Sequence, residues 1–352
     1  MSSSRSLTEW NSENVAKPFG LSNKTSSVCY FNALCQALFG LSYLNEIIIK
    51  ELHHLRLVYQ DRRSGKSHPI TFDEYIKYTN REKNPNNDPE IQEKLNVNNK
   101  KLSVLNEYFK LGNGKLVING LDSKSKNAMI LLSSLITATN AESKLENFRA
   151  IKYGFGQDDA EFGFYRFLNL NPKLEDAFKI KYTITRRCKN CGDEESYEDY
   201  RCSVHLSKDD YNAYHKDIRR FLLNHSEEIE DFKCEKCEET VKCERIFNLK
   251  MVSEIIVITI HKYELTRENY VFNIPTELHF TGPGKNDKMT FRLTSEIEYY
   301  GSGSHGHYKT ISRRNDNKTY SFNDETVSQS GFNTNAKGGY FLFYHLWKKS
   351  TK

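Results

Sequence analysis

The chain has no long block of like charge. Its 51 basic and 46 acidic residues are interspersed along 352 positions and leave a net charge of +5 at pH 7. A nucleic-acid binder needs a basic stripe that follows a phosphate backbone. The balanced charge therefore argues against a nucleic-acid partner, including the hypothesis of a zinc-ribbon nucleic-acid binder.

Long apolar runs are also absent. The most apolar stretch is IIVITI, residues 255–260, whereas a membrane-spanning helix needs about 20 apolar residues. The N-terminal residues lack the layout of a secretory signal. We therefore expect no membrane partner and a soluble protein of the cytoplasm and/or nucleus. Thiols stay reduced there, so the eight cysteines favour metal binding or catalysis over disulfides.

No internal repeat is present, and the two halves of the chain differ in character. Residues 1–17 are typical of a frayed tail, residues 60–99 favour an exposed and mobile stretch, and helical patterns follow near residues 128–137 and 160–168. β-branched and aromatic runs typical of strands fill the second half, at residues 178–188, 254–263, 289–300 and 338–347. This order predicts an α+β fold.

Cys29 lies in the stretch NKTSSVCYFNALCQALFG, directly after small polar residues. Apolar residues then recur at helical spacing, which predicts a helix that begins near Cys29 and ends at Gly40. A helix N-terminus offers unpaired N–H groups and the positive end of the helix dipole, and both stabilise a thiolate. Cys29 is therefore a candidate nucleophile, whereas Cys35 is predicted to be a core residue.

Two Cys-x-x-Cys pairs, CKNC and CEKC, supply four candidate metal ligands: Cys188, Cys191, Cys234 and Cys237. Each pair places two thiolates on a tight turn, as tetrahedral zinc with four sulfur ligands requires. The long gap between the pairs predicts a hairpin or small subdomain. We expect a structural zinc ion and no catalytic cofactor, because a closed site has no open coordination position. Cys202 and Cys243 lack this spacing and are predicted to be packed small residues.

A catalytic thiol also needs a general base, normally a histidine that a third group orients. His305 and His307 lie in a Gly/Ser-rich stretch predicted to be a loop that leads into a strand, a common setting for catalytic residues. Asn323 and Asp324 follow at the end of another short predicted strand. Either of their side chains could accept a hydrogen bond from an imidazole N–H.

Five ordered motifs resemble those of the ubiquitin-specific proteases. GLSNKTSSVCYFNALCQAL is similar to the family's cysteine box, G-L-x-N-x-G-N-T-C-Y-x-N-x-x-x-Q, and GQDDAEFGFYRFL to its Q-Q-D-A-x-E-F box. GHYKTISR, TYSFNDETVS and GGYFLFY together resemble its histidine box, and VITIHKYEL and YVFNIPTEL resemble the segment before that box. The two cysteine pairs lie where the family has its zinc finger. The resemblance runs from Gly20 to about Tyr344.

The resemblance implies a papain-like fold described as a hand. A helical thumb of residues 20–172 would carry the cysteine, zinc-ribbon fingers of residues 173–253 would follow, and an antiparallel β palm of residues 254–352 would carry the histidine. Residues 1–19 would form a disordered N-terminal tail before this catalytic domain.

Site roles follow from the same resemblance. It implies that Cys29 is the nucleophile, His307 the general base and Asn323 the residue that orients His307, with Asp324 as the neighbouring alternative. Asn23 of the G-L-x-N element is implied to be an oxyanion donor.

Substrate binding is implied for two acidic residues and one glycine. The family uses the acids at Asp158 and Glu161 to bind arginines of the ubiquitin tail, and residues three apart share one face of a helix. The stretch GSGSHG, which ends at Gly306, is flexible enough to gate a narrow channel over Cys29. Such a channel would admit an extended Gly-Gly tail.

The implied activity is that of a deubiquitinase, a thiol protease that hydrolyses isopeptide or peptide bonds at the C-terminal glycine of ubiquitin through a thioester. Its partners would be ubiquitin or ubiquitinated proteins and a recruiting adaptor protein.

The chain departs from the family pattern in two boxes. Asn23 lies six positions before Cys29 rather than five, and Gly156 and Asp159 replace the first glutamine and the alanine of the second box. The alternative hypothesis is therefore a catalytically impaired scaffold that binds ubiquitin or another protein without turnover.

Overall fold

The computed structural model describes most of the second half of the chain and selected parts of the first. The described residues are 18, 20, 21, 23, 28–44, 47, 56–61, 67–70, 114–119, 159–168, 172–261, 270–281, 288–302, 305–314, 316–332, 334–336 and 339–350. The predicted tail, the helix predicted near residues 128–137 and most of residues 60–99 lie outside them. The chain forms two compact units, one of Met1–Asn45 with Leu145–Lys352 and one of Glu46–Lys144.

In the second unit, three strands form an antiparallel sheet. The strands are β1 (Arg56–Asp61), β2 (Ser67–Ile70) and β3 (Gly114–Asn119), and β1 lies in the middle.

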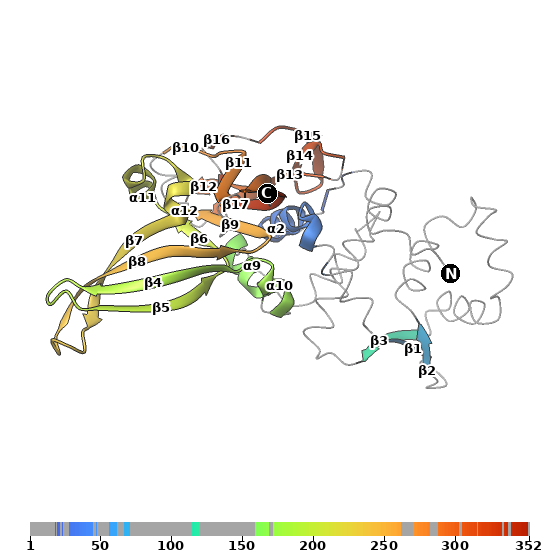
Figure 1. Ribbon diagram of the computed structural model, residues 1–352. Coiled ribbons are helices and arrows are strands. Elements are labelled where there is room, and N and C mark those ends of the chain that lie inside the picture. The colour runs from blue at the N-terminus through green and yellow to red at the C-terminus, as the bar shows by residue number, and fades with distance from the viewer. Residues whose placement is uncertain are drawn as a thin grey trace. The chain divides into compact units, whose positions relative to one another are not determined.

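The first unit is built on an eight-stranded sheet with the order β15-β14-β13-β12-β17-β9-β6, and β11 also pairs with β12 (Figure 1). Its strands are β6 (Val204–Leu206), β9 (Ile255–Ile260), β11 (Glu277–Thr281), β12 (Lys288–Ser302), β13 (His305–Arg313), β14 (Thr319–Asn323), β15 (Thr326–Gln329) and β17 (Gly339–Ser350). The β6–β9 pair is parallel and the other pairs are antiparallel. β9 is buried along its whole length, which explains why five of its six residues are apolar.

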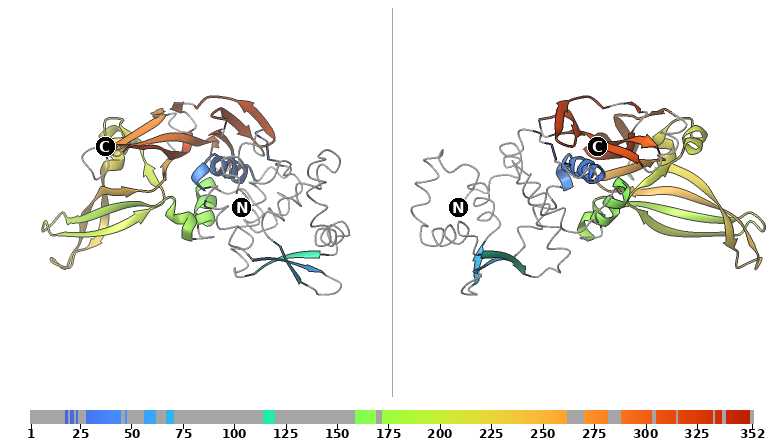
Figure 2. Two further views of the ribbon diagram at one scale, coloured as in Figure 1. Left: turned by 45° about the vertical axis from the view of Figure 1, so that its right-hand side comes forward. Right: turned by 180° about the vertical axis from the view of Figure 1, so that it is seen from behind.

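Two smaller groups of elements border this sheet. β10 (Phe272–Asn273) pairs with β16 (Asn335–Ala336), and the helix α10 (Pro172–Asp176) follows α9 (Ala160–Leu168). α9 buries Phe164 in an aromatic cluster, with ring centroids 5.0 Å from Phe178, 5.3 Å from Phe341 and 6.0 Å from Phe343. The helix α2 (Cys29–Phe39) lies beside α9 in both views of Figure 2, and a Cβ added at Gly163 would lie only 3.1 Å from Leu34.

A second, four-stranded antiparallel sheet has the order β5-β4-β8-β7 (Figure 1). Its strands are β4 (Ile180–Cys188), β5 (Glu194–Arg201), β7 (Asn224–Lys233) and β8 (Thr240–Val252). Two short helices, α11 (Lys208–Ala213) and α12 (Ile218–Leu223), lie between β6 and β7 in the sequence. Ser207 and Asp217 lie directly before these helices, and their side chains cap them.

The described elements confirm the predicted α+β class. The four predicted strand runs correspond to β4, β9, β12 and β17, and the two predicted helices that lie in the described part of the chain correspond to α2 and α9. The sequence patterns did not predict α11, α12, β5, β7 or β8. Short capped helices and strands rich in charged residues have little apolar periodicity. None of the described helices has the length and apolar character that crossing a membrane requires.

Candidate active site

Cys29 is the first residue of α2, and only 2% of its surface is exposed. The helix begins here because the carbonyl of Val28 accepts hydrogen bonds from the N–H groups of Phe31 and Asn32, at 3.0 and 2.9 Å. The predicted position of the thiol at a helix N-terminus is therefore confirmed.

Side chains from β12 and β13 and from the residue after β13 hold α2 along its length. The bonds are Thr310 Oγ1 to Ala33 O at 2.6 Å, Ser295 Oγ to Ala37 O at 2.8 Å and Arg314 Nη1 to Gln36 O at 3.0 Å. The helix therefore has a fixed position against the sheet that carries the histidine.

His307 lies on β13, and its imidazole contacts the next strand. Its Nε2 lies 2.5 Å from Asn323 Oδ1 at the end of β14. An amide oxygen only accepts, so Nε2 donates and the other ring nitrogen, Nδ1, is left as the basic one. The next residue, Tyr308, directs its backbone N–H at the Cys29 sulfur. The strand of His307 thus lies directly against the thiol.

Asp324 occupies the tight turn between β14 and β15 with a φ of 49°, a backbone conformation that Asp adopts more readily than most residues. Its carboxylate accepts from Asn32 Nδ2 at 2.7 Å and from Asn23 Nδ2 at 2.9 Å. His307 Nε2 is 4.0 Å from Asp324 Oδ2, beyond hydrogen-bond range. Of the two predicted partners for the imidazole, the geometry therefore favours Asn323.

Asn23 is fixed from both ends of its amide. Its Oδ1 accepts from the N–H of Val28 at 3.2 Å, and its Nδ2 donates to Asp324. Its segment also lies against the hairpin turn, because Leu21 N–H donates to Asp324 O at 2.8 Å. These bonds place Asn23 beside the start of α2, and its Nδ2 carries a second hydrogen.

The groups around Cys29 shift the pKa of its thiol in opposite directions. Burial has the largest effect and raises the pKa of the thiol, and the negative charge of Asp324 raises it further. The backbone N–H groups of Tyr308, Tyr30 and Cys29 lower the pKa by stabilising a thiolate. Since the net pKa lies above its ordinary value, the thiol stays protonated until a base removes its proton.

Glu161, one of the two acids implied to bind substrate, lies in the first turn of α9. Three side chains hold its Oε1: His205 Nε2 at 2.9 Å, Thr259 Oγ1 at 3.2 Å and Ser203 Oγ at 3.4 Å. The Glu161 side chain keeps 19% of its surface exposed. The other acid, Asp158, lies outside the described residues.

The prediction of a Gly/Ser loop around His305 is wrong for the residues of this stretch that the structure describes. Gly301 pairs with Gly306, and Ser302 pairs with His305, as the last residues of β12 and the first of β13. A Cβ at Gly306 would lie 2.2 Å from the ring of Tyr299, so glycine is required by close packing. The described residues of this stretch are therefore paired in strands, and the gate over Cys29 stays a prediction.

The four cysteines of the two Cys-x-x-Cys pairs meet at one end of the four-stranded sheet. All four sulfurs lie within 4.8 Å of one another. Cys188 and Cys237 are 3.9 Å apart, and Cys191 and Cys234 are 3.7 Å apart. Sulfurs bound to one tetrahedral zinc at about 2.3 Å are separated by about 3.8 Å. The donor set and its spacing therefore fit a zinc ion with four thiolate ligands.

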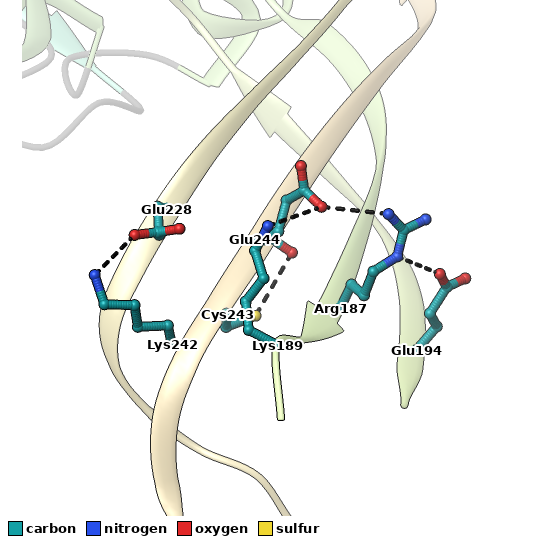
Figure 3. A network of polar contacts seen from close by, with 7 residues as sticks. All are labelled: Arg187, Lys189, Glu194, Glu228, Lys242, Cys243 and Glu244. Atoms are coloured by element: carbon teal, nitrogen blue, oxygen red, sulfur yellow. Dashed lines mark hydrogen bonds and ion pairs between the residues drawn. The ribbon is translucent and has the colours of Figure 1, made fainter. Parts of the chain in front are cut away.

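Ion pairs connect the strands near this cluster (Figure 3). The pairs are Arg187–Glu194 at 2.5 Å, Arg187–Glu244 at 3.3 Å, Lys189–Glu244 at 3.5 Å and Lys242–Glu228 at 3.1 Å. Cys243 is fully buried opposite Cys188, and its thiol contacts the carbonyl of Glu244 at 3.6 Å. It does not belong to the four-sulfur cluster, as the sequence predicted.

A family model described as ubiquitin carboxyl-terminal hydrolase matches residues 19–344, nearly the whole chain. The chain belongs to this family. No curated protein sequence matches it.

Solved structures with the same fold include the SAGA DUB module Ubp8/Sgf11/Sus1/Sgf73 bound to monoubiquitin, with a TM-score of 0.59 and 14% identity over 95% of this chain and 70% of that chain. The same module bound to ubiquitin aldehyde has a TM-score of 0.60 and 14% identity, and the match covers 98% of this chain and 72% of that chain. A yeast SAGA DUB module with a mutant Sgf73 has a TM-score of 0.60 and 14% identity, and the match covers 99% of this chain and 72% of that chain. At this identity the similarity shows the fold, a ubiquitin-specific protease hand.

In this ubiquitin carboxyl-terminal hydrolase, several residues that build the site were not predicted from the sequence. Asn32 bonds to Asp324 across 292 positions, and Asp159 contacts tyrosines of β13 and β17. Asn32 stands at the Asn of the C-Y-x-N element, a signal that could have identified it. Asp159 departs from the family pattern, so the pattern gave no role for it.

Proposed function

We propose that this chain is a deubiquitinase that hydrolyses isopeptide or peptide bonds at the C-terminal glycine of ubiquitin. The observation that carries the proposal is the 2.5 Å bond from His307 Nε2 to Asn323, on a strand whose next residue contacts Cys29. This arrangement leaves Nδ1 as the basic nitrogen of an imidazole on the strand that contacts the buried thiol.

The proposed reaction proceeds through a thioester. His307 Nδ1 takes the thiol proton as the Cys29 sulfur attacks the glycine carbonyl. The C–N bond then breaks, and His307 returns the proton to the leaving lysine amine. Water attacks the thioester with His307 as the base, which releases the ubiquitin carboxylate and restores the Cys29 thiol. Asn323 keeps the imidazole oriented throughout.

We propose that Asn23 stabilises the oxyanion. Its Nδ2 gives one hydrogen to Asp324, and the other would donate to the developing oxyanion together with the backbone N–H of Cys29. One such donor contributes roughly 100- to 1000-fold in rate. Asp324 would act on catalysis indirectly, by fixing this amide.

The proposed substrate-binding residues and partners are those that the resemblance to the family implies. We propose that Asp158 and Glu161 bind the basic tail of ubiquitin and that Gly306 lies at the rim of the tail channel. A structural zinc ion would be held by the four clustered cysteines. The related modules contain ubiquitin and further subunits, which supports ubiquitin and a recruiting adaptor as partners, and we propose the cytoplasm and/or nucleus as the location.

The assignment of the base is tested with two neighbouring histidines. We expect His307→Ala to lower hydrolysis of a fluorogenic ubiquitin substrate by about 100- to 10,000-fold, since it removes the general base. His305→Ala is the matched control and should hydrolyse at nearly the wild-type rate. Equal loss in both variants, or a greater loss in His305→Ala, would contradict the assignment.

A scaffold that binds ubiquitin without turnover is the alternative outcome, and the raised pKa of Cys29 is the observation that favours it. This alternative predicts ubiquitin binding by a titration with the unmodified protein, together with no hydrolysis of the fluorogenic substrate. Hydrolysis that disappears in Cys29→Ser would exclude it.

A further inference from the structure

Asp159 occupies the position directly before α9, where the family's second box has alanine. Its Oδ1 accepts from the N–H of Glu161 at 2.8 Å, and its carbonyl accepts from the N–H of Gly163 at 3.0 Å. This is the geometry of an N-cap residue. A cap alone would use one carboxylate oxygen.

Two buried tyrosines also donate to this carboxylate. Tyr340 Oη donates to Oδ1, and Tyr308 Oη lies 3.4 Å from Oδ2. Both hydroxyls are buried, and burial followed by the charge of Asp159 raises the pKa of each tyrosine above its ordinary value. The two hydroxyls therefore stay protonated and act as donors, and both carboxylate oxygens are engaged.

Tyr308 links this carboxylate to the nucleophile. Its hydroxyl reaches Asp159, while its backbone N–H points at the Cys29 sulfur, and it directly follows His307. The ring of Tyr299 packs on Tyr308, with centroids 4.9 Å apart, and Gly306 leaves the space that Tyr299 fills. A shift of β13 at Tyr308 would therefore move both the base and the N–H donor to the thiol.

We propose that Asp159 is a positioning residue for the active site: through Tyr308 and Tyr340 it fixes β13 and β17 to the first turn of α9. It thereby sets the position of the Tyr308 N–H against Cys29 and presents Glu161 at a defined place beside the site. The proposal rests on the proposed hydrolase function and gives it a determinant that the family pattern lacks.

The test separates the tyrosine contacts from the helix cap. Asp159→Asn and Asp159→Ser can both still cap α9, but neither offers two charged oxygens to the tyrosines. Tyr308→Phe and Tyr340→Phe remove the donors one at a time. Tyr344→Phe is the matched control, because Tyr344 lies on the same strand as Tyr340 and its buried hydroxyl donates to the carbonyl of Pro275 at 2.8 Å.

Two rates are measured for each full-length variant: ubiquitin hydrolysis, separated into kcat and KM, and alkylation of Cys29 by iodoacetamide. We expect Asp159→Asn and Tyr308→Phe each to lower kcat/KM about 10- to 100-fold, as loss of hydrogen bonds to a charged group predicts. Alkylation should slow several-fold. The double variant Asp159→Asn/Tyr308→Phe should resemble Asp159→Asn alone, because that change already disrupts the contact that Tyr308→Phe removes.

Three results would overturn the proposal. Wild-type rates in Asp159→Asn and Asp159→Ser would leave Asp159 as a helix cap only. Faster alkylation in Asp159→Asn would show that the carboxylate acts through its charge, since removing a nearby negative charge favours the thiolate. Additive losses in the double variant would show that Asp159 does not act through Tyr308.

The alkylation rate keeps this test independent of the proposed hydrolase function. If the wild-type protein hydrolyses no ubiquitin, slower alkylation in Asp159→Asn, Tyr308→Phe and Tyr340→Phe, with Tyr344→Phe unchanged, still supports the positioning role. Unchanged alkylation in all of these variants overturns it.

Discussion

Asp324 has two different effects at the site: one on the position of the loop before Cys29 and one on the pKa of the Cys29 thiol. Its carboxylate binds the amides of Asn23 and Asn32, which fixes the loop before the nucleophile. The same charge raises the pKa of the Cys29 thiol. The site therefore gains a fixed geometry at some cost in thiolate population, which is consistent with a thiol that loses its proton to His307 during the reaction.

Replacing Asp324 by Asn separates these two effects. We expect the pKa of Cys29 to fall because the negative charge is removed, so alkylation by iodoacetamide should extend to lower pH. Hydrolysis of ubiquitin should nevertheless fall by about 100-fold, the order of loss expected when a catalytic group is misplaced by about 1 Å. The measurements are the pH dependence of alkylation and the steady-state rate.

Glu325→Gln is the control for Asp324→Asn, since it removes an exposed carboxylate at the next position. It should change neither measurement. An unchanged or higher pKa of Cys29 in Asp324→Asn would contradict the electrostatic account.

Residues in local motifs were predictable from the sequence, and residues joined across the chain were not. Cys29, His307 and Asn323 stand in recognisable boxes, and the structure places His307 against Asn323. The bond from Asn23 to Asp324 spans 301 positions, so no local pattern contains it. Which of Asn323 and Asp324 contacts the imidazole depends on the direction of the chain in a tight turn.

Among the elements, the hairpin of β14 and β15 depends on a close approach by Gly20. A Cβ at Gly20 would lie 2.2 Å from the carbonyl oxygen of Glu325, which is backbone and cannot rotate away. We expect Gly20→Ala to displace the turn that carries Asn323 and Asp324. Ubiquitin hydrolysis should fall by about 100-fold, and overpacking should destabilise the protein by about 1–3 kcal/mol.

The matched control for this change is Gly331→Ala, because a Cβ there meets no described atom within 4 Å. Denaturant unfolding and steady-state hydrolysis should both be close to wild type in the control. A fully active Gly20→Ala protein would show that the hairpin turn tolerates displacement.

The end of α2 shows how a correct prediction can rest on an incomplete reason. The sequence predicted that the helix ends at Gly40, as it does, but Gly40 has a φ of −66°, which any residue can adopt. Glycine is needed because a Cβ would lie 2.3 Å from Ser312 Oγ and 2.6 Å from Ser295 Oγ. Such packing against distant strands cannot be read from local spacing.

On the scale of the whole molecule, the chain order separates the nucleophile from the base and places the cysteine cluster between them. The four-stranded sheet that carries the cluster has many exposed ion pairs, which individually stabilise little. A bound zinc ion would therefore be a main source of stability at its far end. The two cysteine pairs made this cluster predictable, because their spacing is a local pattern.

Metal removal tests this role of the cluster. We expect the purified protein to hold about one zinc ion per chain by elemental analysis. Chelation, or Cys234→Ser, should lower the unfolding temperature and weaken ubiquitin binding, because a metal held by all four thiolates would no longer fix the ends of β4 and β8. Cys243→Ser is the control and should retain zinc. Full stability without metal would contradict a structural zinc site.

The most direct test of the central claim is the reaction of the full chain with ubiquitin that carries a C-terminal electrophile, followed by mass spectrometry of the adduct. The account predicts one covalent adduct on Cys29 that is absent in Cys29→Ser and strongly reduced in His307→Ala. A folded, zinc-containing protein that forms no adduct, or forms it on another cysteine, would contradict the assignment of Cys29 as the nucleophile.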